Sequence, residues 1–261
     1  MSQAAAIDRD LDGKVAIVTG ASNGIGRAAA AQLAARGARV LAVARDQSRL
    51  QSLERETGAI PCAISIETAE ACVEVVSRAR QFGSPTILIN SAGRGGYLDR
   101  PIFEQTSEDW RQTLAVNLDA CFELSRHVAL DIRRSGFGRI VMISSTAGEV
   151  GAPAMSAYCA SKHGVIGLMR SLAHDIAPYG GTCNAVLPSW VRTEMAEQDA
   201  LKEAAQRGLS ADAVWAERAQ QNPAGRILDV QEVANVVSFL ASAAASGVNG
   251  QAITVSIGSN W

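Results

Sequence analysis

Seven short apolar runs punctuate the chain at near-regular intervals, and this pattern limits the possible folds more than any other feature. The runs are KVAIVT, ARVLAVA, AIPCAIS, TILIN, GRIVMIS, GTCNAVL and QAITVS, and the stretches between them are long enough for crossover helices. Runs that are apolar throughout are typical of parallel strands buried on both faces. The sequence therefore predicts an α/β fold with a doubly wound, seven-stranded parallel sheet and helices on both faces.

The length and composition indicate one soluble domain that acts on a small molecule. A chain of 261 residues with 48% hydrophobic and 19% charged residues can bury one large core, so residues 1–261 are expected to form a single domain. The net charge is −2, without a block of like charges, which disfavours nucleic acid or anionic lipid as a partner.

The chain carries no targeting signal or metal-binding pattern. The first residues, MSQAAAIDRDLDGK, lack the apolar core of a signal peptide, and no run of eighteen apolar residues occurs, so we expect a cytoplasmic protein without membrane spans. The five cysteines show neither metal-ligand spacing nor a disulfide framework. We therefore expect no metal site, and buried free thiols.

One irregular region interrupts the regular alternation. Residues 188–225 are rich in charge and alanine and contain Trp190 and Trp215 between two clearly patterned elements. We interpret this region as a helical flap over a substrate site.

The segment TGASNGIG follows the first predicted strand and opens a predicted helix. Glycines there allow a backbone to approach a pyrophosphate, and the N–H groups at the helix start favour an anion. The segment therefore predicts a dinucleotide site, although a tight strand-to-helix turn needs the same residue types. The residues concerned are Gly20, Ser22, Asn23, Gly24, Ile25 and Gly26.

The end of the second predicted strand bears on the choice of cofactor. An acidic residue at this place selects NAD, whereas a basic one accommodates the additional phosphate of NADP. The strand ends in Ala44 and is followed by Arg45, so we expect NADP, with NAD as the alternative. An exposed arginine before a helix that starts at Asp46 would give the same pattern.

Tyr158 precedes Lys162 by four residues in SAYCASKHG, which places both side chains on one helical face. Alone, this pair is common on solvated helices. If the ammonium lies at ~4 Å, however, it stabilises a phenolate by about 4 kcal/mol at an effective dielectric of ~20, or roughly 3 pKa units. We therefore expect the pKa of Tyr158 to fall towards neutral pH, although burial would act in the opposite direction.

Several motifs in a fixed order resemble the short-chain dehydrogenase/reductase family over nearly the whole chain. They are the glycine segment, Asn90-Ser-Ala-Gly93, Asn117, Ser145 and the Tyr158–Lys162 pair. The resemblance implies a Rossmann-type sheet and a Ser-Tyr-Lys-Asn catalytic group.

Roles for individual residues follow from this resemblance. Tyr158 would exchange a proton with the substrate oxygen, Ser145 would hydrogen-bond that oxygen, Lys162 would hold the nicotinamide ribose, and Asn117 would position a water. Further cofactor contacts are expected from Asn90, Ala92, Gly93, Pro188 and Thr193. Substrate contacts are expected from Arg94, Tyr97, Trp190 and Met195.

These features predict an NADP-dependent reductase of a ketone or β-keto substrate, including 3-oxoacyl thioesters. The alternatives are an NAD-dependent secondary-alcohol dehydrogenase and a dinucleotide-sensing regulator without turnover. The resemblance also implies a homotetramer that uses two long helices, about 106–134 and 155–177, and the last strand.

Overall fold

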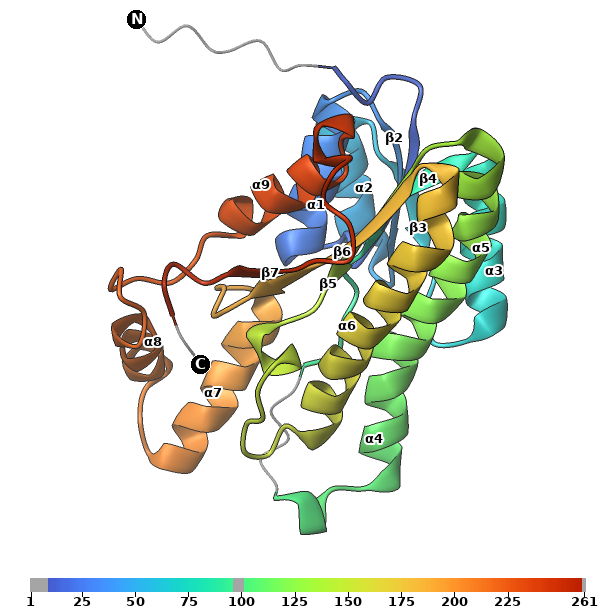
Figure 1. Ribbon diagram of the computed structural model, residues 1–261. Coiled ribbons are helices and arrows are strands. Elements are labelled where there is room, and N and C mark those ends of the chain that lie inside the picture. Colours follow the sequence, from blue (N-terminus) through green and yellow to red (C-terminus); the bar gives the residue numbers. More distant parts are fainter. Residues whose placement is uncertain (1–8, 96–100, 260–261) are drawn as a thin grey trace, which may run out of the picture.

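A computed structural model describes residues 9–95 and 101–259 of the chain (Figure 1). Its centre is a seven-stranded parallel sheet with the strand order β3-β2-β1-β4-β5-β6-β7. This sheet confirms the predicted fold class, and each predicted apolar run contains one strand. The strands are β1 (Val15–Thr19), β2 (Arg39–Ala44), β3 (Ile60–Ala63), β4 (Pro85–Asn90), β5 (Gly138–Ile143), β6 (Gly181–Pro188) and β7 (Ala252–Val255).

Helices cover both faces of this sheet, as Figure 1 shows. One face carries α1 (Gly24–Ala35), α2 (Gln47–Thr57) and α9 (Val230–Leu240). The other face carries α3 (Ala69–Arg80), α5 (Ala120–Ser135) and α6 (Ser156–Ile176). The remaining helices are α4 (Ser107–Leu114), α7 (Glu194–Arg207) and α8 (Ala211–Gln220).

The alternation of side chains along each strand divides the core into two large clusters. In β1, Val15 and Ile17 pack towards α3, α5 and α6, whereas Ala16 and Val18 pack towards α1, α2 and α9. All five residues of β1 are buried, because both faces of the strand are covered. This explains why the strands read as continuous apolar runs in the sequence.

The helices α7 and α8 stand apart from this sandwich. They form a small third cluster of Ala200, Ala204, Val214 and Trp215. In Figure 1 the two helices lie below the ends of the central strands. They occupy most of the region expected to form a flap.

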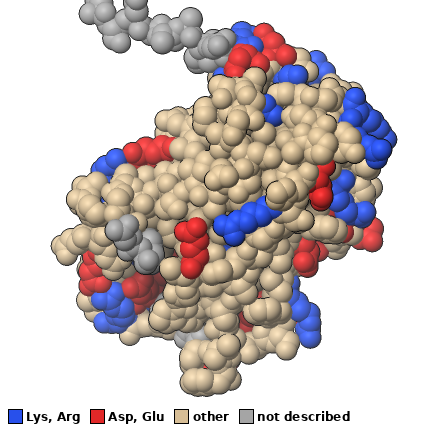
Figure 2. Space-filling model, viewed as in Figure 1, with Lys and Arg blue, Asp and Glu red and all other residues tan. Residues whose placement is uncertain are grey.

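None of the helices among the described residues is long and apolar enough to cross a membrane. On the face shown in Figure 2, basic and acidic residues form small interspersed groups. This distribution agrees with the net charge of −2.

Candidate active site

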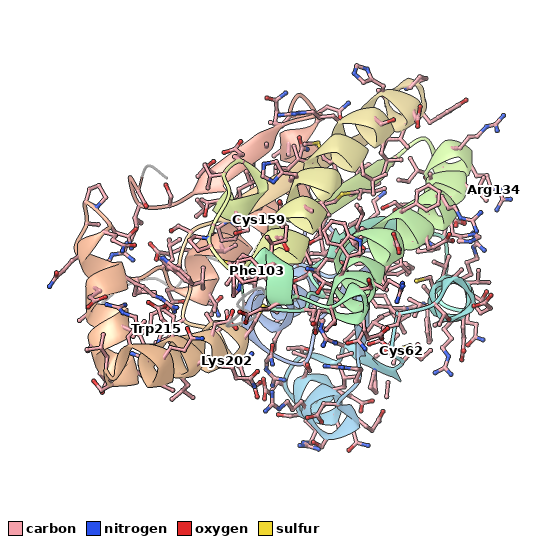
Figure 3. All side chains as sticks on the ribbon, turned by 90° about the horizontal axis from the view of Figure 1, so that it is seen from below. Cys62, Phe103, Arg134, Cys159, Lys202 and Trp215 are labelled. Carbon is pink, nitrogen blue, oxygen red and sulfur yellow. The ribbon has the colours of Figure 1, made fainter. Side chains whose placement is uncertain are left out.

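A cleft of about 980 Å³ lies at the carboxyl ends of the strands. This is where parallel α/β sheets bind ligands, and the chain reverses its direction of winding between the adjacent strands β1 and β4. The cleft is lined by the glycine segment, the ends of β2, β4, β5 and β6, the start of α6 and the start of α7. Seen from below in Figure 3, α7 with Lys202 and α8 with Trp215 lie to one side of the part of α6 that carries Cys159.

The glycine segment forms a tight turn that only glycine permits. Gly20 has a φ of 67°, and a Cβ there would lie 2.9 Å from the backbone of Ala92. A Cβ on Gly26 would collide with the carbonyl oxygen of Gly20. Thr19 fixes the neighbouring loop, because its hydroxyl accepts hydrogen bonds from the backbone N–H groups of Ser91 and Ala92, each at 3.0 Å.

The start of α1 fits an anionic group. Its N-cap residue, Asn23, makes no side-chain cap, and its first turn has no acidic residue. By contrast, Asp46 caps α2 and Thr68 caps α3 with their side chains. Free N–H groups at a helix start, facing a cleft, are suited to a pyrophosphate.

The three reacting groups predicted from the sequence come together in the cleft. Ser145, at the end of β5, hydrogen-bonds through its side chain to Tyr158 on α6. The Nζ atom of Lys162 lies 5.6 Å from the centre of the Tyr158 ring and donates a 2.7 Å hydrogen bond to the carbonyl oxygen of Ile143. Ser144 points elsewhere, since its hydroxyl donates to the carbonyl oxygen of Lys162 at 3.0 Å. Ser145 is therefore the serine directed at Tyr158.

The expected lowering of the tyrosine pKa is wrong for the protein without cofactor. Burial raises the pKa of Tyr158 to about 12, and the hydrogen bond from Ser145 only partly opposes this. Burial also lowers the pKa of Lys162 to about 8. The Lys162 ammonium is directed at the carbonyl oxygen of Ile143, and desolvation of the phenol is the largest cause of the shift. Tyr158 is consequently a protonated phenol at neutral pH.

Asn117 occupies an irregular point of its helix. A π-helical turn, Ala115–Asp119, joins α4 to α5, and such turns often occur at functional sites. The side-chain amide of Asn117 accepts a 2.7 Å bond from the N–H of Arg94 and donates to Ser161 Oγ at 3.1 Å. It therefore braces the loop after β4 against α6. Its expected role in holding a water stays a prediction.

The structure places most of the other predicted residues at the cleft wall. Arg45, Ala92, Gly93, Pro188 and Thr193 line it from the cofactor side, and Arg94, Trp190 and Met195 line it from the expected substrate side. Asn90 is buried beneath the cleft and donates to Ser125 Oγ at 3.3 Å. Tyr97 lies outside the described residues.

The cleft also contains charged residues that no sequence motif singles out. Asp199 of α7 lines it close enough to raise the pKa of Tyr158 further, after the larger effect of burial. Arg49 of α2 and Glu194 of α7 meet at the cleft wall. These positions belong to ordinary charged helix faces in the sequence, and only the packing of α7 against the cleft brings them to the site.

The chain is similar to known reductases along nearly its whole length. A family model described as Enoyl-(Acyl carrier protein) reductase matches residues 20–260. The 3-oxoacyl-(acyl-carrier-protein) reductase FabG of Escherichia coli (strain K12) is 36% identical over 252 residues, which cover 95% of this chain and 98% of that protein.

Two solved structures match the same share of this chain. Levodione reductase has a TM-score of 0.89 at 28% identity, and an actinorhodin polyketide ketoreductase solved with NADPH has a TM-score of 0.88 at 32% identity. Each match covers 95% of this chain and 98% of the other.

Proposed function

The chain belongs to the short-chain dehydrogenase/reductase family of NAD(P)-dependent oxidoreductases, and on this premise we propose that it is an NADP-dependent reductase of ketone or β-keto substrates. The 3-oxoacyl thioesters are included, because the curated relative is named for a 3-oxoacyl substrate. The observation that carries the proposal is the meeting of Ser145, Tyr158 and Lys162 beside a glycine-rich loop in one cleft.

The chemistry is proton donation to an oxygen as its carbon is reduced. Reduced nicotinamide, when bound, supplies the hydride. Tyr158 then gives its phenolic proton to the carbonyl oxygen, and the Ser145 hydroxyl hydrogen-bonds the same oxygen while negative charge develops there. A phenol with a pKa of about 12 is fully protonated at neutral pH. It is still far more acidic than the product alcohol, so transfer of its proton to the developing alkoxide is favourable. The Lys162 ammonium, on the same helical face, stabilises the phenolate that is left.

The cofactor contacts follow from the shape of the cleft. The uncapped start of α1 and the residues Gly20 to Gly26 would hold the pyrophosphate. Arg45, exposed at the cleft edge after β2, would meet the adenosine phosphate of NADP. Thr193 would contact the carboxamide at the nicotinamide end.

We also propose that residues 188–225 act as a flap over the substrate. Support comes from Trp190 and Met195, which line the cleft, and from the separate small core of α7 and α8. A wall of tryptophan and methionine favours substrates with an apolar part.

The second candidate is an NAD-dependent secondary-alcohol dehydrogenase. It is favoured by the charge balance at the adenosine end, where Arg49 is already paired with Glu194. A dinucleotide-sensing regulator without turnover is the third candidate, but such a protein has no need of a tyrosine, a serine and a lysine at one point.

The test is steady-state kinetics on a panel of ketones, β-keto thioesters and secondary alcohols, followed at the absorbance of reduced nicotinamide. We expect reduction of β-keto substrates with a kcat/KM for NADPH at least about tenfold above that for NADH, which one phosphate–arginine contact can supply. A tenfold preference for NADH contradicts the choice of cofactor. Tight cofactor binding without turnover across the panel favours the regulator.

We further propose a cytoplasmic homotetramer. The five cysteines are all free and buried, as expected in a reducing compartment. Trp110, Phe122 and Leu130 are exposed apolar side chains on α4 and α5, one of the two long helical segments proposed to form the interface. Light scattering at micromolar concentration tests this assembly, and a monomer there would contradict it.

A further inference from the structure

Three side chains from distant parts of the chain meet at the adenosine end of the cleft. Glu194, the first residue of α7, accepts a 2.6 Å hydrogen bond from the side-chain amide of Asn23 in the glycine segment. The same carboxylate pairs with the guanidinium of Arg49 on α2 through Nη1, and Nη2 lies 3.3 Å from its other oxygen. All three residues line the cleft.

The charges at this corner cancel. Arg45 and Arg49 each carry a positive charge, whereas Asp46 and Glu194 each carry a negative one, and all four side chains line the cleft. Asp46 is committed to α2, because it caps the helix by accepting from the N–H of Arg49 at 3.1 Å, and its other oxygen lies 3.3 Å from Nε of the Arg49 guanidinium. The ion pair between Arg49 and Glu194 is therefore the charge interaction at this end of the cleft that a bound ligand can change.

A phosphate can replace Glu194 as the partner of Arg49. The side chains of Arg49 and Glu194 are 45% and 44% exposed, and ion pairs exposed to this degree add little stability. A phosphate monoester offers the guanidinium a second charge and a matching pair of oxygens. The pKa of Glu194 is held below its ordinary value, mainly by Arg49, so the competing carboxylate is ionised at neutral pH.

We propose that Arg49 is a second ligand, beside Arg45, for the adenosine phosphate of NADP, and that Glu194 competes with this phosphate and so sets the preference for NADP over NAD. This inference rests on the proposed use of NADP. In the absence of the phosphate, Glu194 holds Arg49. When the phosphate binds, Arg49 turns to it and Glu194 keeps only its bond to Asn23.

The competition also links cofactor choice to the region that covers the cleft. Glu194 begins α7 and directly follows Thr193, whose side chain caps that helix. Thr193 lies over the glycine segment, since a Cβ on Gly24 would stand 3.2 Å from its methyl group. Recognition of the adenosine phosphate therefore acts on the same short segment that is proposed to contact the nicotinamide end.

The test is calorimetric binding of two fragments, 2′,5′-ADP and 5′-AMP, which differ only in the second phosphate. The proteins are the wild type, Arg49→Gln, Glu194→Gln and the double variant. Arg55→Gln, which removes an exposed charge from the same helix, is the matched control.

We expect Arg49→Gln to weaken binding of 2′,5′-ADP by about tenfold or more and to leave 5′-AMP within about twofold, since charged hydrogen bonds have this value. Glu194→Gln should tighten binding of 2′,5′-ADP severalfold. The same change made in the Arg49→Gln protein should have no effect on it. Arg55→Gln should behave as the wild type.

Three outcomes would overturn the proposal in distinguishable ways. If Arg49→Gln leaves the preference for 2′,5′-ADP intact while Arg45→Gln removes it, the chain uses NADP but Arg49 is not a ligand. If Glu194→Gln weakens binding of 2′,5′-ADP, Glu194 supports the phosphate site instead of competing for it. If the wild type binds the two fragments equally, the proposed use of NADP fails together with this inference.

Discussion

The sheet sandwich and the α7–α8 region are built from different interactions, although both line the same cleft. In the sandwich, every residue of β1, β4, β5 and β6 is buried, between two large apolar clusters. The α7–α8 region has a core of only four buried residues and is completed by charged and aromatic side chains.

One buried arginine holds the α7–α8 region together. The guanidinium of Arg218 lies 3.8 Å from the centre of the Trp190 ring and 4.9 Å from that of Trp215. It also donates a 2.8 Å hydrogen bond to Glu203 of α7. Trp215 in turn donates from Nε1 to Glu197 at 2.8 Å. These contacts connect α8 to α7 and to the cleft wall at Trp190.

This difference in packing indicates that the two regions contribute different kinds of side chain to the cleft. The side chains proposed to react, Ser145 and Tyr158, come from a strand end and from a helix that packs into the main core. Side chains proposed to contact the substrate come from a region with few apolar contacts, and such regions open at lower free energy. Variants in each region test this division, and the largest effect is expected at Tyr158.

Tyr158→Phe removes the proposed proton donor, which belongs to the sheet sandwich. We expect kcat to fall by about 10²–10⁴-fold, the usual value of a positioned acid, with no change of fold. Steady-state kinetics and circular dichroism measure the two effects. Tyr179→Phe, at a partly exposed tyrosine outside the cleft, is the matched control. More than a few per cent of residual turnover in Tyr158→Phe would remove the basis of the proposed mechanism.

The burial of Lys162 makes the free energy of unfolding depend on pH. The pKa of Lys162 is about 8 in the folded protein, against 10.5 for a lysine in water, so between these values the unfolded chain binds more protons. The free energy of unfolding therefore rises with pH in this window, by at most about 1.4 kcal/mol per pH unit and about 3 kcal/mol in all.

Urea unfolding of the cofactor-free protein and of Lys162→Met, from pH 7 to 9.5, measures this contribution as a difference. Titration of Tyr158 does not interfere, because its raised pKa costs stability only above pH 10. Parallel curves for the two proteins would mean that the burial of Lys162 does not shift its pKa.

Two glycine substitutions compare the regions directly. A Cβ on Gly26 collides with the backbone of Gly20, so Gly26→Ala should cost about 1–3 kcal/mol of stability and abolish dinucleotide binding. Gly208 ends α7 with a φ of 65° in open space, so Gly208→Ala should cost about 1 kcal/mol and leave binding intact. Chemical denaturation and cofactor titration measure both effects. Equal losses of binding would contradict the assignment of the glycine segment.

Arg218→Met removes the cation between the two tryptophans. Such contacts contribute about 2 kcal/mol when desolvated, so amide exchange in α7 and α8 should become roughly tenfold faster or more. Exchange in β4, β5 and α6 should not change, which mass spectrometry of peptic fragments can show. Arg170→Met, at an exposed position of α6, is the control. Faster exchange throughout the sheet would mean that the two regions do not open independently.

The sequence alone was sufficient for the sheet, for the helices around it and for the expectation that Ser145, Tyr158 and Lys162 lie in one cleft. Apolar runs report burial on both faces of a strand, and a spacing of four residues reports a shared helical face, because both depend on local geometry. Tyr158 and Lys162 therefore fall on the same face of α6, and the strand-end residue Ser145 falls at the cleft.

The tertiary structure alone decided the electrostatics and the long-range contacts. The sign of the Tyr158 pKa shift depends on how much water the packed cleft excludes, which no spacing encodes. The contact between Arg49 and Glu194 joins residues 145 positions apart, and the hydrogen bonds of Asn117 join its π-helical turn to Ser161 of α6 and to Arg94. Local patterns specify the elements, whereas the meeting of distant side chains depends on how those elements pack.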